Sequence, residues 1–220
     1  MYTQTARKTG SMQWMTGTAM MVALLIVLAN TPLGLIRLPF LTATTLHIPV
    51  IIATLTLGLA SGVVTGLVFG VISLLGNLTG TSFFAPFFIN PLVSVLPRVL
   101  FPIGVYAIAK AASGLTDRLG HGRFAAYMAA SALGTGLHTA MVMGMIDLLN
   151  HQKIAAMLEA GAGVPQAIAE KGVNAGIAAL GVANGLPEAL VAALIAPVVA
   201  VALEKALGRS AVKKINRQRA

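Results

Sequence analysis

Two oppositely charged residues interrupt apolar stretches of this chain, and they are the first candidates for chemistry. Arg98 stands in the run Pro91-Leu-Val-Ser-Val-Leu-Pro-Arg98-Val-Leu-Phe-Pro, and Glu188 follows Asn184-Gly-Leu-Pro. A charge at the centre of a bilayer costs about 2.5–3.5 kcal/mol on insertion scales, so such a residue faces a bundle interior or a wet cavity. Glu188 is the expected partner of Arg98. The pair predicts either a polar binding pocket or a buried ion pair that fixes helix register.

Other polar residues fall in the same half of the predicted helices as this pair. The candidate binding residues are Arg98, Asn90, His138, Glu188, Asn184, His47 and Asn77. For His138 alone, the alternative is a histidine bonded to a neighbouring backbone carbonyl. Together the residues predict an outward-facing pocket for a small solute.

Prolines flank these candidates at Pro91, Pro97, Pro102 and Pro187. Each proline lacks a backbone donor and frees a carbonyl, which lipid tolerates only where protein or water satisfies that carbonyl. Broken helix starts beside an arginine are typical of a solute site in a transporter.

Motifs of catalysis are missing from the sequence. It has no Walker glycine loop, no His-Glu-x-x-His and no Gly-x-Ser-x-Gly, and no acidic cluster that would hold magnesium. The absence of cysteine excludes disulfides and Cys-ligated metals. We therefore predict neither an enzyme nor a cofactor or metal site. The net charge of +9 does not indicate nucleic acid, because the basic residues flank apolar runs instead of forming one patch.

The elements that must position the candidates are membrane helices. Hydrophobic residues make up 57% of the 220 residues and charged residues 10%, and the mean hydropathy is +0.86. A soluble domain needs more polar surface than this. We predict an all-α membrane protein, a single bundle of six transmembrane helices over residues 14–30, 46–60, 61–78, 91–112, 124–147 and 184–207.

Basic residues decide the helix count. The run 46–78 is too long for one crossing and contains Gly58 and Ser61-Gly62. Two helices in this run place the three main basic groups on one side, as cytoplasmic segments require. These groups, which hold eleven of the fifteen basic residues, lie before residue 14, around 110–123 and from 205 onward. The prediction is an N-in, C-in topology with a basic cytoplasmic tail at 208–220.

The segments 31–45, 79–90 and 148–183 are then external. We expect a short surface helix over 154–170. The phenylalanine-rich segment 79–90 is predicted either to cover the pocket or to lie in the interface as an aromatic belt. The first apolar run follows Arg7 and Lys8, as a signal peptide would, but no clear cleavage site follows it, so a retained helix is favoured.

Small residues recur every four positions on two predicted helices. Gly62, Gly66 and Gly70 lie on one face of the third helix, and Ala19 and Ala23 on one face of the first. Such faces let helix backbones approach closely in lipid. We expect the glycines to pack within the bundle, whereas the alanines fit packing within the bundle or against a partner.

The stretches Thr45-Leu-His-Ile-Pro-Val-Ile-Ile-Ala53 and Asn90-Pro-Leu-Val-Ser-Val-Leu-Pro-Arg-Val-Leu100, with the glycine-spaced third helix, resemble the S components of energy-coupling factor (ECF) transporters. The resemblance extends over nearly the whole chain. It implies a six-helix subunit of the bacterial plasma membrane that captures a vitamin from outside and docks on a T component with two ATPases. The segment 148–183 is longer than the family pattern explains.

The resemblance also implies roles for particular residues. Ala19-Met-Met-Val-Ala23 matches the family's Ala-x-x-x-Ala docking motif for the T component, and the segments 31–45 and 79–90 match the loops that gate the site. The overall pattern is most similar to the pantothenate branch. An arginine suits the carboxylate of pantothenate, and few Trp and Tyr residues are present to stack on a flat ring. The alternatives are a stand-alone facilitator or channel for small solutes and a membrane structural subunit.

Overall fold

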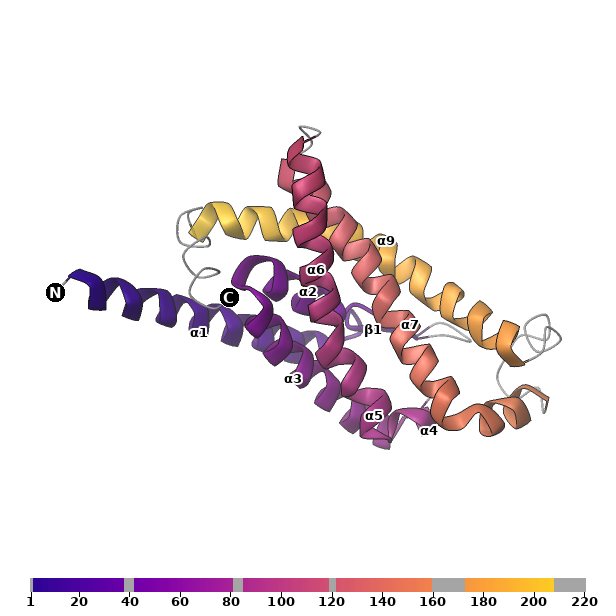
Figure 1. Ribbon diagram of the computed structural model, residues 1–220. Coiled ribbons are helices and arrows are strands. Elements are labelled where there is room, and N and C mark those ends of the chain that lie inside the picture. The colour runs from indigo at the N-terminus through magenta and orange to yellow at the C-terminus, as the bar shows by residue number, and fades with distance from the viewer. Residues whose placement is uncertain (1, 38–41, 81–84, 119–121, 160–172, 208–220) are drawn as a thin grey trace.

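The computed structural model describes residues 2–37, 42–80, 85–118, 122–159 and 173–207 (Figure 1). Long helices dominate this part of the chain, because every backbone polar group must find its partner inside a segment that crosses lipid. The elements are α1 (Tyr2–Ala29), β1 (Leu35–Arg37), β2 (Thr42–Thr44), α2 (His47–Leu57), α3 (Leu59–Leu78), α4 (Ala85–Phe88), α5 (Pro91–Ser94), α6 (Leu96–Arg118), α7 (Gly122–Glu159) and α9 (Val173–Leu207).

Five helical stretches are long and apolar enough to cross a membrane. They are Met12–Ala29, Leu59–Leu78, Pro91–Thr116, Gly122–Met157 and Asn174–Ala206. The remaining predicted helix, 46–60, corresponds to α2, whose 11 residues are fewer than the roughly 20 that usually span the hydrocarbon. The six-helix count and the N-in, C-in orientation therefore remain predictions. Figure 1 shows the start of α1 and the end of α9 on the same, left-hand side.

The central element of the bundle is α2. All of its 11 residues are buried, and it packs against α1, α3, α6, α7 and α9. A helix wrapped by others on every side needs no polar face, which explains its apolar run Ile48-Pro-Val-Ile-Ile-Ala53. Gly58 separates α2 from α3 with a φ of 94°, a left-handed conformation that favours glycine.

The glycine face of α3 packs inside the bundle against α6. A Cβ atom on Gly66 would overlap the carbonyl oxygen of Arg98, and one on Gly70 would lie 2.8 Å from the Cα of Val95. These contacts bring α3 close to the first turns of α6, where Arg98 lies. The glycine spacing therefore serves packing within the chain and helps to position the candidate site.

The helix ends differ from the predicted ones. The first helix begins at Tyr2 instead of residue 14. The helix α6 ends at Arg118 instead of residue 112, and α7 begins at Gly122 instead of residue 124. Most of the predicted external segment 148–183 is also helical, because α7 continues to Glu159 through non-helical dihedrals at Asn150, and α9 begins at Val173. Hydropathy marks where lipid contact stops, whereas backbone hydrogen bonding carries a helix further. The rest of the expected surface helix and the tail 208–220 lie outside the described residues.

A short hairpin joins α1 to α2. The strands β1 and β2 pair antiparallel, with Leu35 opposite Thr44 and Arg37 opposite Thr42. Thr45 N–H donates to the carbonyl of Gly34 at 3.1 Å, and the Thr45 hydroxyl donates to that of Leu33 at 2.7 Å. These bonds tie the end of the hairpin to its beginning just before α2.

Candidate functional site

Arg98 lies in the first turn of α6 and is buried, with 4% of its surface exposed. Its Nη1 donates a hydrogen bond to the carbonyl of Val93 at 2.6 Å. In a regular helix that carbonyl would accept the N–H of residue 97, but Pro97 has none. The proline thus supplies an acceptor for the guanidinium at the junction of α5 and α6.

Phenylalanine rings cover the guanidinium. Its Cζ lies 4.8 Å from the ring centroid of Phe88 on α4 and 5.5 Å from that of Phe69 on α3. A cation over an aromatic face is attracted by the ring's quadrupole, most strongly where water is excluded. The segment 79–90 therefore contributes a ring to the site, in agreement with a covering role.

Two histidines from different helices meet beside these rings. The His47 and His138 rings are stacked with centroids 6.3 Å apart and planes inclined by 20°. His138 also lies 4.9 Å from the Phe101 ring and 5.9 Å from the Phe69 ring. The backbone of Thr44 and of Glu188 lies beside His47. The site thus joins α2, α3, α6, α7 and α9.

Glu188 does not form the expected ion pair with Arg98. Its Oε1 accepts the backbone N–H of Thr44 at 2.6 Å, and the described residues include no direct contact between its carboxylate and the guanidinium. The two charges still interact through space. The two side chains have other partners. The Arg98 guanidinium bonds to the Val93 carbonyl and lies against two phenylalanine rings, while the Glu188 carboxylate accepts the Thr44 N–H of the hairpin.

Several buried polar atoms at this place have no hydrogen-bond partner. Within the described part of the chain they include both ring nitrogens of His47, both of His138 and Nε of Arg98. Oδ1 of Asn184 is also buried without a partner, and a Cβ atom on the neighbouring Gly185 would lie 2.9 Å from Thr139, the residue after His138. Leaving a buried polar group unpaired costs about 1–3 kcal/mol, so native proteins rarely tolerate several together without a role. Donors and acceptors that converge unpaired are suited to a polar ligand.

Two of the predicted binding residues lie apart from this cluster. Asn90 is exposed and caps α5, where its Oδ1 accepts the Leu92 N–H at 3.0 Å. Asn77 donates to the carbonyl of Ser73 at 2.7 Å, within its own helix α3. Their side chains therefore serve the local backbone. Ala19 and Ala23, by contrast, are exposed on α1, where a docking surface would need them.

Phe69, Phe101 and Thr44 were not predicted as parts of the site, and Phe88 was predicted only as part of the segment 79–90. Phenylalanine in a membrane helix resembles ordinary lipid-facing or core residues, so its type carries no signal. The clue for Thr44 was its position just before His47, but only the folded chain shows that its N–H reaches α9.

The chemistry open to this arrangement is recognition. The described residues include no group of three or more metal-binding side chains. A guanidinium, two imidazoles and an amide oxygen, walled by phenylalanine, fit a ligand that has an anionic group and further hydrogen-bonding groups.

Comparison with known proteins agrees with this geometry. No curated protein sequence matches the chain significantly. A family profile described as "ECF transporter, substrate-specific component" matches residues 13–200, most of the chain. Members of this family are transport proteins, not enzymes, and generally work with a T component and ATPases. The chain therefore belongs to the substrate-specific components of ECF transporters, the subunits that bind the transported solute.

Proposed function

We propose that this subunit binds a small water-soluble vitamin with a carboxylate group, with pantothenate as the first candidate. The observation that carries the proposal is the convergence of unpaired polar atoms from α2, α6, α7 and α9 at one buried place. An apolar bundle would gain stability from replacing these groups by hydrocarbon, so their retention implies a ligand.

The groups match the chemistry of pantothenate. Arg98 is buried beside two aromatic rings, where a carboxylate forms strong, charge-assisted hydrogen bonds with a guanidinium. Asn184 Oδ1 accepts a hydroxyl or amide proton, and each neutral histidine offers one donor and one acceptor. Phe69, Phe88 and Phe101 contact the apolar part of an acyclic ligand.

The hairpin and α4 close the site from one side. Glu188 holds the hairpin through the Thr44 N–H, and Phe88 of α4 lies over Arg98. A solute enters when these two covers separate, and the Thr44–Glu188 bond re-forms behind it. This assigns Glu188 to closure rather than to direct contact with the carboxylate.

Delivery to the cell interior is proposed to require a T component and two ATPases in the bacterial plasma membrane. The helix α1 is the least buried of the five candidate spans, with 17% of its apolar window buried. Ala19 and Ala23 lie exposed on it, and small residues admit a partner helix at close range. We expect Ala19→Trp with Ala23→Trp to abolish uptake by the assembled transporter and to preserve solute binding by the isolated subunit.

The matched control for that experiment is Ala107→Trp, at an exposed alanine of α6. We expect this variant to retain uptake. Loss of binding in the α1 variants would contradict a docking role for this face.

The substrate is tested by calorimetry on the purified subunit. Pantothenate should bind saturably at one site, whereas panthenol, in which a hydroxymethyl group replaces the carboxylate, should bind about 100-fold more weakly. A thermal-shift screen of other vitamins serves as the comparison. Equal affinity for pantothenate and panthenol, or stabilisation by an uncharged vitamin alone, would contradict the proposed recognition by Arg98.

A further inference from the structure

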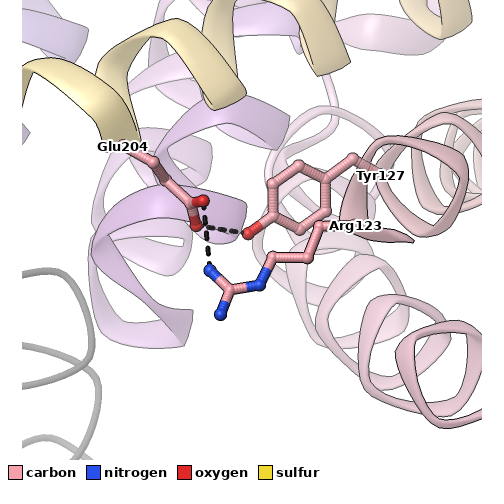
Figure 2. A network of polar contacts seen from close by, with 3 residues as sticks. All are labelled: Arg123, Tyr127 and Glu204. Carbon is pink, nitrogen blue, oxygen red and sulfur yellow. Dashed lines mark hydrogen bonds and ion pairs between the residues drawn. The ribbon is translucent and has the colours of Figure 1, made fainter. Parts of the chain in front are cut away.

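A second polar network joins α7 to α9 far along both helices from the binding cluster (Figure 2). Glu204 accepts a hydrogen bond from the Tyr127 hydroxyl at 2.5 Å and one from Arg123 Nη1 at 3.2 Å. Glu204 and Tyr127 are buried, whereas the Arg123 side chain is 41% exposed. Figure 2 shows both partners reaching one carboxylate from the same helix. The network is the charged contact that the structure describes between these two helices.

The same two helices carry part of the binding cluster. His138 lies 11 residues after Tyr127 on α7, and Glu188 lies 16 residues before Glu204 on α9. At ~1.5 Å per residue these separations are about 16 Å and 24 Å. The helices α7 and α9 pack extensively against each other, and polar residues of both helices lie at two points along this contact, around the binding cluster and at Glu204.

Between these two points α9 contains a site of bending. Pro197 lies between Glu188 and Glu204, and Pro187 precedes Glu188. A proline removes one helical hydrogen bond and is a common cause of kinks. Figure 1 shows α9 changing direction between its orange and yellow parts. The end that carries Glu204 is thus able to move relative to the end that carries Glu188.

Space for such a movement adjoins the network. Tyr127 also lines a pocket of about 110 Å³, whose other walls include Tyr106 and Lys110 of α6 and Thr54 of α2. The Tyr127 side chain is buried, and this pocket is the space beside it that a movement of the ring would use.

We propose that Arg123, Tyr127 and Glu204 form a latch that holds α7 and α9 together while the binding cluster is closed and separates when the solute is released. Opening the latch lets the end of α9 beyond Pro197 swing from α7, which loosens the contact of both helices with the solute. The inference rests on the proposed transport role but not on pantothenate being the substrate.

The chain contains no cysteine, so a pair of introduced cysteines reports on the latch cleanly. Phe124→Cys with Lys205→Cys places labels on exposed neighbours of the network and preserves its three residues. Distances between spin labels are measured in the subunit assembled with its T component and ATPases, at rest and during ATP turnover. A single distance at rest and a second, longer distance during turnover are expected. One unchanged distance throughout would overturn the proposal.

Locking the same pair with a cleavable bifunctional thiol reagent gives an independent readout. Uptake should fall at least about ten-fold and recover after reduction, while single-cysteine variants treated alike keep their uptake. Unimpaired uptake by a fully cross-linked subunit would also overturn the latch. Binding by the isolated subunit is measured separately, so failure of the pantothenate assignment is distinguished from failure of the latch, because the label distances need no substrate.

Tyr127→Phe separates a latch from a purely structural contact. It removes one hydrogen bond to a charged group and keeps the ring, so the longer distance, which the unaltered network shows only during turnover, should become detectable at rest. Lower thermal stability with an unaltered distance distribution would identify the network as structural and contradict the proposal.

Discussion

The two polar regions of this bundle differ in how completely their groups are paired. Around Arg98, six buried nitrogen and oxygen atoms of four residues have no partner among the described residues. Around Glu204, the carboxylate has both a tyrosine hydroxyl and an arginine as donors. Both regions lie between long apolar helices, so their surroundings do not explain the difference.

The difference in pairing distinguishes groups that bind a solute from groups that stabilise a contact between helices. A buried polar group whose partner is supplied by the fold stabilises one arrangement of helices, whereas one without a partner lowers stability until a ligand arrives. We therefore assign solute recognition to the cluster around Arg98 and control of the α7–α9 contact to the network around Glu204. Substitutions around Arg98 should lower affinity more than thermal stability, whereas substitutions around Glu204 should lower thermal stability more than affinity.

The largest expected effect follows Arg98→Ala. Removing the guanidinium should weaken pantothenate binding at least about 100-fold, because the ligand carboxylate would be buried without its charged partner. Thermal stability of the empty protein should fall little, since the variant also removes an unpaired Nε atom. Calorimetry and a melting curve on the inserted protein measure the two quantities. Unchanged affinity would remove Arg98 from the site and end the contrast between the regions.

Glu204→Ala should give the reverse signature. It leaves the buried Tyr127 hydroxyl unpaired, a cost of about 1–3 kcal/mol, which corresponds to a fall in Tm of about 5 °C for a chain of this size. Affinity of the isolated subunit for its solute should change less than about three-fold. Glu204→Gln is the matched variant, and its Tm should fall less, because the amide oxygen of Gln still accepts the hydrogen bond from the Tyr127 hydroxyl. A loss of affinity as large as that of Arg98→Ala would contradict the division.

Glu188 lies in the binding cluster, yet one of its oxygens is paired with the hairpin. It therefore combines a feature of each region. Glu188→Ala should speed solute dissociation about ten-fold by freeing Thr44 and with it the cover. Glu188→Gln retains an acceptor for the Thr44 N–H and should dissociate only slightly faster. Stopped-flow dissociation rates compare the variants. Equal rates for Gln and Ala would indicate that the charge of Glu188, rather than the hairpin bond, acts on the solute.

The smallest expected loss of affinity is that of Asn184→Ala, with Asn30→Ala as its control. Oδ1 of Asn184 is buried and unpaired, whereas Asn30, the residue after α1, donates to the carbonyl of Ile26 in that helix at 2.8 Å. Asn184→Ala should weaken binding about five-fold through loss of one hydrogen bond to the ligand, and Asn30→Ala should leave affinity within about two-fold. Equal effects in calorimetry would show that lack of a partner does not identify a binding group in this protein.

Sequence reasoning placed Arg98, His47, His138, Asn184 and Glu188 among the candidate binding residues, because polar residues in apolar runs are conspicuous. Their role in binding stays a prediction. The predicted pairing of Arg98 with Glu188 was wrong, since opposite charge and similar depth do not say which backbone groups are free nearby. Pro97 was noted as freeing a carbonyl, but only the helix junction shows that Arg98 takes it. The side chains of Asn77 and Asn90 bond to the local backbone near helix ends, which their residue type alone does not reveal, and their role in binding stays a prediction.

The amino-acid sequence by itself determined the membrane class, the apolar helices and the burial of Arg98, because each depends on local composition and on the cost of charge in lipid. It also indicated a break within 46–78, which was predicted after residue 60 and lies at Gly58. The tertiary structure decided which polar groups meet. The stacking of His47 on His138, the Thr44–Glu188 bond and the Glu204 network join residues from 77 to 144 positions apart. Such contacts depend on how helices cross, and apolar periodicity does not encode which turn of one helix faces which turn of another.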